Sequence, residues 1–249
     1  IPVWSNNGTT AGGSYSVDAG DLDRYLENNL EYMVFVPAGN KGFSLTNGRD
    51  VYTDLSDGES SAVDDPTSVG QGVTRPLQIS PPATAKNIVA AGATCSDTFT
   101  MFGPFNEEEN VQNYTAKGPA TAASLRTAPM LVGVGNDRTP TGGGPAPLGI
   151  YTVKSKDNDQ GGTVDAEVDE QSRGTSFGAA NIAAAATLME DYFKQGFYPT
   201  GNRNQGDRVG VVSGAALKAM LAASANMTEQ LIGLNGSSVS MDGNDAQVT

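Results

Sequence analysis

The sequence of 249 residues contains no histidine and a single cysteine. One cysteine excludes an internal disulfide framework and a cysteine-based zinc site, and the absence of histidine removes the commonest other metal ligand. We therefore expect no cofactor, and any bound metal would be a hard, oxygen-liganded ion such as calcium. Cys95 follows the apolar run VAAGAT, where we expect a small core residue rather than a reactive thiol.

Basic residues and long apolar runs are also scarce. Lys and Arg number 15 against 28 Asp and Glu, and no basic cluster exceeds a pair, so nucleic acids and anionic membranes are poor partners. No apolar stretch approaches the roughly 18 residues of a membrane span, and no signal peptide is recognisable. The chain begins at Ile1 rather than Met, from which we expect a processed or truncated chain.

An extracellular or secretory location is indicated by N-x-S/T sequons alone. A chain this rich in Asn, Ser and Thr produces several such sequons by chance, so glycosylation is left open. The sequons begin at Asn7, Asn113, Asn226 and Asn235.

Apolar periodicity predicts alternating helices and strands. Leu22, Tyr25, Leu26 and Leu30 stand at helical spacing, and the short apolar runs at 32–36, 87–93 and 128–134 are typical of strands buried on both faces. The alanine-rich run from Ser176 to about Gly196 predicts a central helix that is buried all round, and Ser213 is expected to cap a last helix. This alternation predicts an α/β fold with a doubly wound, mostly parallel sheet.

Three polar stretches interrupt this pattern. Residues 43–82 are expected to be an irregular surface insertion, and 235–249 a flexible polar tail. The acidic centre of the insertion, DLSDGESSAVDDP, is either a solvated loop or a structural calcium site, although the D-x-D-x-D-G loop is missing. The Gly/Pro-rich stretch at 139–147 is a further expected surface loop. The G-x-G of GVGND lacks a third glycine, which argues against a dinucleotide site.

Four segments, PAGNKG, PPATAKNIVAAGA, YTAKGP…RTAPMLVGVG and GTSFGAANIAAAATL, resemble in order and spacing the second half of the catalytic domain of subtilisin-like serine proteases. The segment GGSYSVDAGDLDRYL is similar to the one just upstream of the family's A-G-N motif, so the resemblance covers roughly 5–230. It implies that 1–234 form the C-terminal part of such a domain, with a doubly wound, mostly parallel sheet and helices on both faces.

The resemblance also implies site residues. It makes Ser176 the acyl-forming nucleophile, and Asn40 and the Ser176 N–H the donors of the oxyanion hole. In this family the catalytic Asp and His precede both motifs, so we expect this chain to start after them and a separate N-terminal segment to complete the fold. Without that segment Ser176 lacks a base. Other interpretations remain: Ser176 as a helix N-cap, and Asn40 as a turn residue.

Several positions depart from the family pattern. In place of G-T-S-x-A-x-P-H-V-A-G, the chain has Gly178, Ala180, Asn181 and Ala184 at the Ala, Pro, His and final Gly positions, and SNNG and LVGVG stand where S-[WL]-G and V-A-P-G are usual. Two functions are therefore weighed. One is a piece of a working endopeptidase that acts on polypeptides; the other is a catalytically silent module with an assembly or binding role.

Overall fold

The computed structural model describes residues 14–46, 49–54, 61–64, 79, 81–96, 110–112, 114–116, 118–119, 126–137, 150–153, 168–226, 230–232 and 238–240. The helices are α1 (Val17–Asn28), α2 (Thr175–Lys194) and α3 (Gly214–Ser224), with a 3-10 turn at Gln205–Asp207. The central sheet contains β1 (Phe35–Pro37), β5 (Val89–Ser96), β6 (Asn110–Val111), β9 (Leu131–Asp137), β12 (Gln230–Ile232) and β13 (Ser238–Ser240). The other described strands form small separate sheets: β2 (Lys41–Thr46), β3 (Arg49–Asp54) and β4 (Ser61–Asp64); β7 (Gly118–Pro119) and β8 (Thr127–Ala128); β10 (Ile150–Val153) and β11 (Val168–Ser172).

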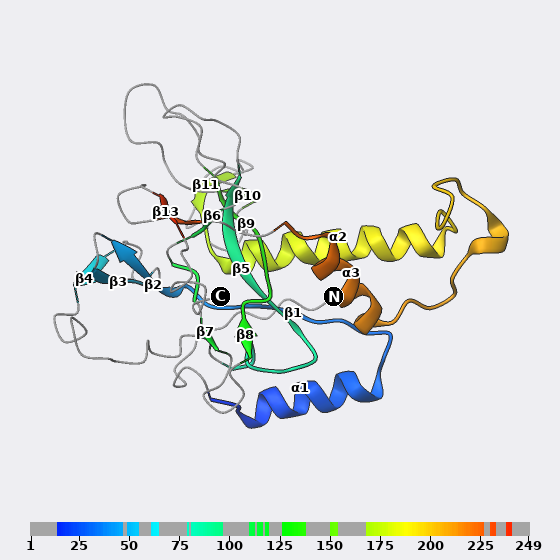
Figure 1. Ribbon diagram of the computed structural model, residues 1–249, viewed down its shortest axis with the longest axis horizontal. Coiled ribbons are helices and arrows are strands. Elements are labelled where there is room, and N and C mark those ends of the chain that lie inside the picture. The colour runs from blue at the N-terminus through cyan, green and yellow to red at the C-terminus, as the bar shows by residue number, and fades with distance from the viewer. Residues whose placement is uncertain are drawn as a thin grey trace, which may run out of the picture.

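Strand β5 is the centre of the sheet. It pairs in parallel with β1 on one side, where Val36 lies opposite Ala90, and with β9 on the other, where Ala91 lies opposite Leu131. Beyond β5 the pairing continues antiparallel to β6, parallel to β12 and antiparallel to β13. The core of the sheet is therefore parallel, and Figure 1 shows α2 and α1 on opposite sides of it. This is an α/β arrangement, as the sequence predicts.

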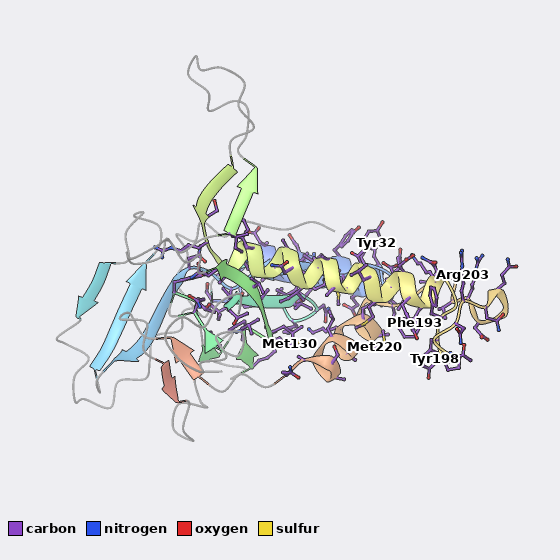
Figure 2. All side chains as sticks on the ribbon, turned by 90° about the horizontal axis from the view of Figure 1, so that it is seen from above. Tyr32, Met130, Phe193, Tyr198, Arg203 and Met220 are labelled. Carbon is purple, nitrogen blue, oxygen red and sulfur yellow. The ribbon has the colours of Figure 1, made fainter. Side chains whose placement is uncertain are left out.

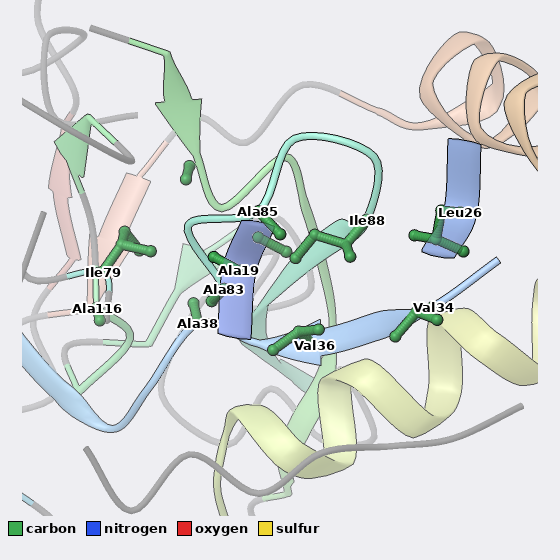
Figure 3. Close-up of a cluster of buried hydrophobic side chains, with 12 residues drawn as sticks. Ala19, Leu26, Val34, Val36, Ala38, Ile79, Ala83, Ala85, Ile88 and Ala116 are labelled. Carbon is green, nitrogen blue, oxygen red and sulfur yellow. The ribbon is translucent and has the colours of Figure 1, made fainter. Parts of the chain in front are cut away.

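Alternate residues along the strands divide the core between the two faces. Val34 and Val36 join α1 in one buried cluster (Figure 3), whereas Met33 and Phe35 join α2 and α3 in another. Because side chains alternate across a strand, the continuous apolar run 32–36 predicts burial on both faces. This is confirmed from Met33 to Val36, and β1 is buried at every position, but Tyr32 lies before the strand and is 49% exposed.

The N-termini of two helices are capped by serine. Ser16 Oγ accepts a hydrogen bond from Ala19 N–H, and Ser213 Oγ accepts one from Ala216 N–H at 3.2 Å. Each bond satisfies a backbone donor that the helix itself leaves unpaired. The predicted cap at Ser213 is confirmed. Helix α1 ends at Asn28, however, so Leu30 lies beyond it and is exposed.

Glycines allow α2 to lie directly on the sheet. A Cβ at Gly178 of α2 would stand 2.2 Å from Gly92 O of β5, and a Cβ at Gly133 of β9 would stand 2.5 Å from Gly178 O. Side chains at these positions would force the helix away from the strands. The G-x-G of GVGND therefore lies in a strand and permits close helix packing.

The C-terminus of α2 follows the hydrogen-bond pattern of a Schellman motif. Gly196 has φ +77°, its N–H donates to Phe193 O, and Phe197 N–H donates to Tyr192 O. This confirms the predicted end of the helix near Gly196. The chain then turns back at the tip in Figure 2, where the rings of Phe193 and Tyr198 lie 5.4 Å apart.

The carboxylate of Asp23 joins α1 to the loop before β5. It accepts hydrogen bonds from the backbone N–H groups of Lys86 and Asn87, both at 2.7 Å, and from Tyr15 Oη at 2.5 Å. The bond to this carboxylate raises the pKa of Tyr15 to about 12. On the other side of the loop, Lys218 of α3 donates to Lys86 O and Ile88 O.

Two of the polar stretches contain strands that apolar periodicity does not predict. The stretch 43–82 is not irregular throughout, because it holds β3, β4 and most of β2, and its Ile79 is fully buried in the α1 cluster. The polar tail contains strand β13, which pairs with β12. Backbone hydrogen bonding in a sheet accommodates polar sequences that apolar periodicity does not detect. The stretch 139–147 lies outside the described residues.

The prediction that α2 is buried all round is wrong. One face packs on the sheet through residues such as Ala179, Ile182 and Ala186, but Ala180 and Ala184 are exposed and Leu188 is 73% exposed. Alanine is apolar without being bulky, so an alanine-rich sequence does not distinguish a buried face from an exposed one.

Candidate functional site

Asn40 lies three residues after Pro37, beyond the carboxyl end of β1, which pairs in parallel with the central strand β5. The turn that leads to it needs Gly39, whose φ of +115° lies in a region that side chains disfavour. Gly39 N–H donates to Thr175 Oγ1 at 3.2 Å, and Gly39 O accepts from Ala116 N–H at 3.0 Å. Asn40 is thereby held half-buried against the start of α2.

Ser176 is the second residue of α2. The N-cap is Gly174, and Ser176 Oγ makes no capping bond, so the interpretation of this serine as an N-cap is wrong. Within the part of the chain that the structure describes, neither its N–H nor its hydroxyl has a hydrogen-bond partner. The half-buried Ser176 therefore presents a free hydroxyl and a free backbone donor at a helix N-terminus.

Thr175 connects the two predicted site residues. Its N–H and its hydroxyl each lie 2.9 Å from Asn40 Oδ1, across 135 positions of sequence. Since a backbone N–H can only donate, the carboxamide oxygen of Asn40 must face Thr175, and Nδ2 takes the other position. Asn40 is therefore hydrogen-bonded to the start of a helix that is distant in sequence. A residue that only forms a turn would not need these bonds.

Gly174 completes this arrangement. Its N–H donates to Gly135 O at 2.9 Å, its φ is +153°, and a Cβ there would stand 3.0 Å from Asn40 Nδ2. Any side chain at this position would crowd the amide of Asn40. The G-T-S sequence thus has a physical basis: glycine gives room, threonine binds Asn40, and serine remains free.

Thr175 is a site residue that reasoning from the sequence missed. It is buried, with 1% of its surface exposed, and its hydroxyl both accepts from Gly39 and donates to Asn40. A polar residue between Gly174 and Ser176 could have drawn attention to it. Its partners, however, are separated from it by more than a hundred residues.

The family departures within α2 have structural roles here. Gly178 allows the close approach to Gly92, and Asn181 Nδ2 donates to Val134 O of β9 at 2.6 Å. Ala180 and Ala184 lie on the exposed side of the helix. The segment SNNG at 5–8 lies outside the described residues.

The arrangement could donate hydrogen bonds to an electron-rich oxygen. Asn40 Nδ2 and Ser176 N–H are both without an acceptor among the residues that the structure describes, and the helix dipole adds positive potential at the start of α2. A hydroxyl stands beside these donors, but the sequence has no histidine to remove its proton.

No metal centre is evident in the described ranges, where no group of three or more Cys, Asp or Glu side chains comes together. In the pairing of β3 with β4, Asp64 lies opposite Val51, and Asp54 lies opposite Ser61. The side chains of these two aspartates are not among those that the structure describes. The predicted calcium site in 54–66 is thus untested. Of the sequons, Asn226 is exposed after α3, and Asn7, Asn113 and Asn235 lie outside the described residues.

None of the described helices is both long and apolar enough to cross a membrane. No protein-family model matches the chain, and no match to it is found among curated proteins.

Proposed function

We propose that this chain is the C-terminal part of a subtilisin-like serine endopeptidase domain, with Ser176 as nucleophile and Asn40 as oxyanion-hole donor. The observation that supports this most strongly is the pair of hydrogen bonds from Thr175 to Asn40 Oδ1. They bring the A-G-N and G-T-S motifs together at one end of the parallel sheet. The two motifs are far apart in sequence, so nothing in either motif alone predicts that they meet.

The proposed reaction is acyl transfer to Ser176. The hydroxyl oxygen attacks the carbonyl carbon of a peptide bond while a base takes its proton, and the carbonyl oxygen becomes an oxyanion. Asn40 Nδ2 and Ser176 N–H then donate to that oxyanion. As the intermediate collapses, the C–N bond breaks and the protonated base gives its proton to the leaving amine. Water then hydrolyses the acyl ester on Ser176 and restores the hydroxyl. Because Thr175 and the sheet already fix both donors, little reorganisation is needed as the charge develops.

The base must come from a separate segment that carries Asp and His. The chain itself has no imidazole, and a carboxylate with a pKa near 4 is a poor base at neutral pH. In subtilisin, loss of the histidine lowers turnover by about 10⁶. The isolated chain should therefore be nearly inactive.

The exposed face of α2 supports the existence of such a completing segment. Ser176, Ala180 and Ala184 are spaced by four residues and share one side of the helix, and the exposed Leu188 continues that side. A histidine that reaches Ser176 has to approach along this side. Alanine would let a partner backbone or helix come close to α2.

A silent module is the second candidate. The departures at Gly178 and Asn181 favour it, because both residues are committed to packing and hydrogen bonding with β5 and β9 in a way the family motif does not need. In this alternative the same exposed face of α2 would serve assembly rather than catalysis.

A peptidyl phosphonate ester distinguishes these candidates, because it forms a covalent bond only with an activated serine. We expect no labelling of the isolated chain, and rapid labelling at Ser176 once a segment carrying Asp and His is added. Ser176→Ala should abolish the adduct in mass spectra. Rapid labelling of the isolated chain would contradict the need for an external base, and an unlabelled completed domain would favour the silent module.

A further inference from the structure

Tyr114 is linked to the start of α2 through the carbonyl group of Gly135. Its side chain is buried, with 2% of its surface exposed, and its hydroxyl donates to Gly135 O at 3.0 Å. The same oxygen accepts the N–H of Gly174 at 2.9 Å. A single carbonyl at the end of β9 therefore joins the hydroxyl of Tyr114 to the N-cap of α2.

The start of α2 depends on such external bonds. Gly174 has no side chain with which to cap the helix, so its first turn is held by Gly174 N–H to Gly135 and by Thr175 N–H to Asn40. The first of these contacts sets where the Gly174–Ser176 turn lies against β9. The second sets where it lies against Asn40.

The turn that carries Tyr114 also holds the Asn40 side of the site. Ala116 N–H donates to Gly39 O at 3.0 Å, and Thr115 Oγ1 accepts from Ala93 N–H at 3.1 Å. Residues 114–116 thus contact β5, the loop before Asn40 and the strand end that anchors α2. These three consecutive residues therefore contact the segments that hold both proposed donors, Asn40 and Ser176.

We propose that Tyr114 is a positioning residue: its hydroxyl orients the Gly135 carbonyl, and through it fixes Ser176 relative to Asn40. Packing alone would be met by phenylalanine, and a buried hydroxyl is unfavourable unless it is hydrogen-bonded. The hydroxyl of Tyr114 therefore serves to hold the Gly135 carbonyl in one orientation. The catalytic consequence rests on the proposed function, whereas the effect on Asn40 does not.

The test compares Tyr114→Phe with Tyr192→Phe. Tyr192 is a matched control, because its hydroxyl also donates to a backbone oxygen, Phe197 O at 3.3 Å, but on the exposed far end of α2. In the chain completed by its Asp- and His-bearing segment, we expect phosphonylation of Ser176 by the phosphonate ester to slow about tenfold in Tyr114→Phe. Substrate KM should change little, and Tyr192→Phe should react as the unmodified protein does.

A double-mutant cycle separates positioning from a general loss of structure. If Tyr114 acts through the alignment of Asn40, Tyr114→Phe should have little further effect in an Asn40→Ala background. Equal fold-losses in both backgrounds would overturn the proposal. Should Tyr114→Phe fail to fold, a ring-fluorinated tyrosine at 114 keeps the hydroxyl and alters its donor strength, and the same cycle applies.

An NMR measurement is independent of activity. The side-chain amide signal of Asn40 should move in Tyr114→Phe and stay in place in Tyr192→Phe. If the completed unmodified domain is not labelled, the proposed protease function fails while this signal still decides the role of Tyr114. An unchanged Asn40 signal would overturn the positioning role.

Discussion

Thr175 binds one atom of Asn40 twice, with its backbone N–H and its hydroxyl each 2.9 Å from Oδ1. The oxygen of the carboxamide is thereby fully engaged, and the Nδ2 donor is left on the other side. The orientation of Asn40 is thus set without using the group that the proposed chemistry needs.

Asn40→Asp separates the two functions of this side chain. The aspartate keeps an oxygen for Thr175 and places its charge near a helix N-terminus, so stability should be retained. It loses the Nδ2 donor, so acylation of the completed domain should fall by about 10² or more, a magnitude known from subtilisin itself. Asn40→Ala should lose both stability and rate. Equal melting temperatures for the two variants would contradict the structural role of Oδ1.

Thr175→Val should destabilise the chain more than Thr175→Ser. Valine fits the space but removes the hydroxyl that accepts from the half-buried Gly39 N–H and donates to Asn40, and loss of the two bonds costs about 1–3 kcal/mol. Serine keeps the hydroxyl and loses one methyl group, which costs about 1 kcal/mol. Denaturant unfolding measures both. A larger loss for Thr175→Ser would show that the methyl group matters more than the hydrogen bonds.

Much of the fold was predictable because its signals are local. The first apolar strand, the apolar strand that became β5 and the cap at Ser213 each depend on neighbouring residues. The cap is where the sequence predicts, whereas β1 (Phe35–Pro37) and β5 (Val89–Ser96) overlap the predicted runs with shifted ends. Strands β2 to β4 were missed because their sequences are polar. The exposed face of α2 was missed because alanine fits both environments.

The site was predictable only in part. A-G-N and G-T-S indicate Asn40 and Ser176 through a family resemblance, and the structure brings their segments together through Thr175. The roles of Thr175, Gly135 and Tyr114 arise from contacts between residues far apart in sequence. No periodicity or spacing rule reports which strand end meets which helix start.

Gly178→Ala should destabilise the chain, although the family motif has alanine there. A Cβ would stand 2.2 Å from Gly92 O, so α2 or β5 would have to shift, at about 1–3 kcal/mol. Gly210→Ala is the control, because nothing lies within 4 Å of a Cβ at Gly210. Equal unfolding free energies for the two variants would show that α2 can move off the sheet freely.

Tyr15 should ionise at a higher pH than an ordinary tyrosine. Its hydrogen bond to Asp23 raises its pKa from 10.0 to about 12, so the folded state holds this proton after the unfolded state has lost it. The stability from this pair is complete below about pH 10 and is lost as pH rises to about 12. A phenolate absorbance titration should show a late step that Tyr15→Phe lacks. A single step near the ordinary tyrosine pKa would contradict this.

Ala184→Glu should leave the isolated chain stable but prevent its completion. Ala184 is exposed on the side of α2 that also carries Ser176, so a carboxylate there remains in water in the chain alone. Once a segment with Asp and His packs along that side, the charge would be buried without a partner, which is strongly unfavourable. Ala219→Glu, on the exposed side of α3, is the matched control. We expect unchanged melting for both variants, and loss of phosphonate labelling in the mixture with the completing segment only for Ala184→Glu. Normal labelling of that variant would show that the completing segment does not use this face of α2.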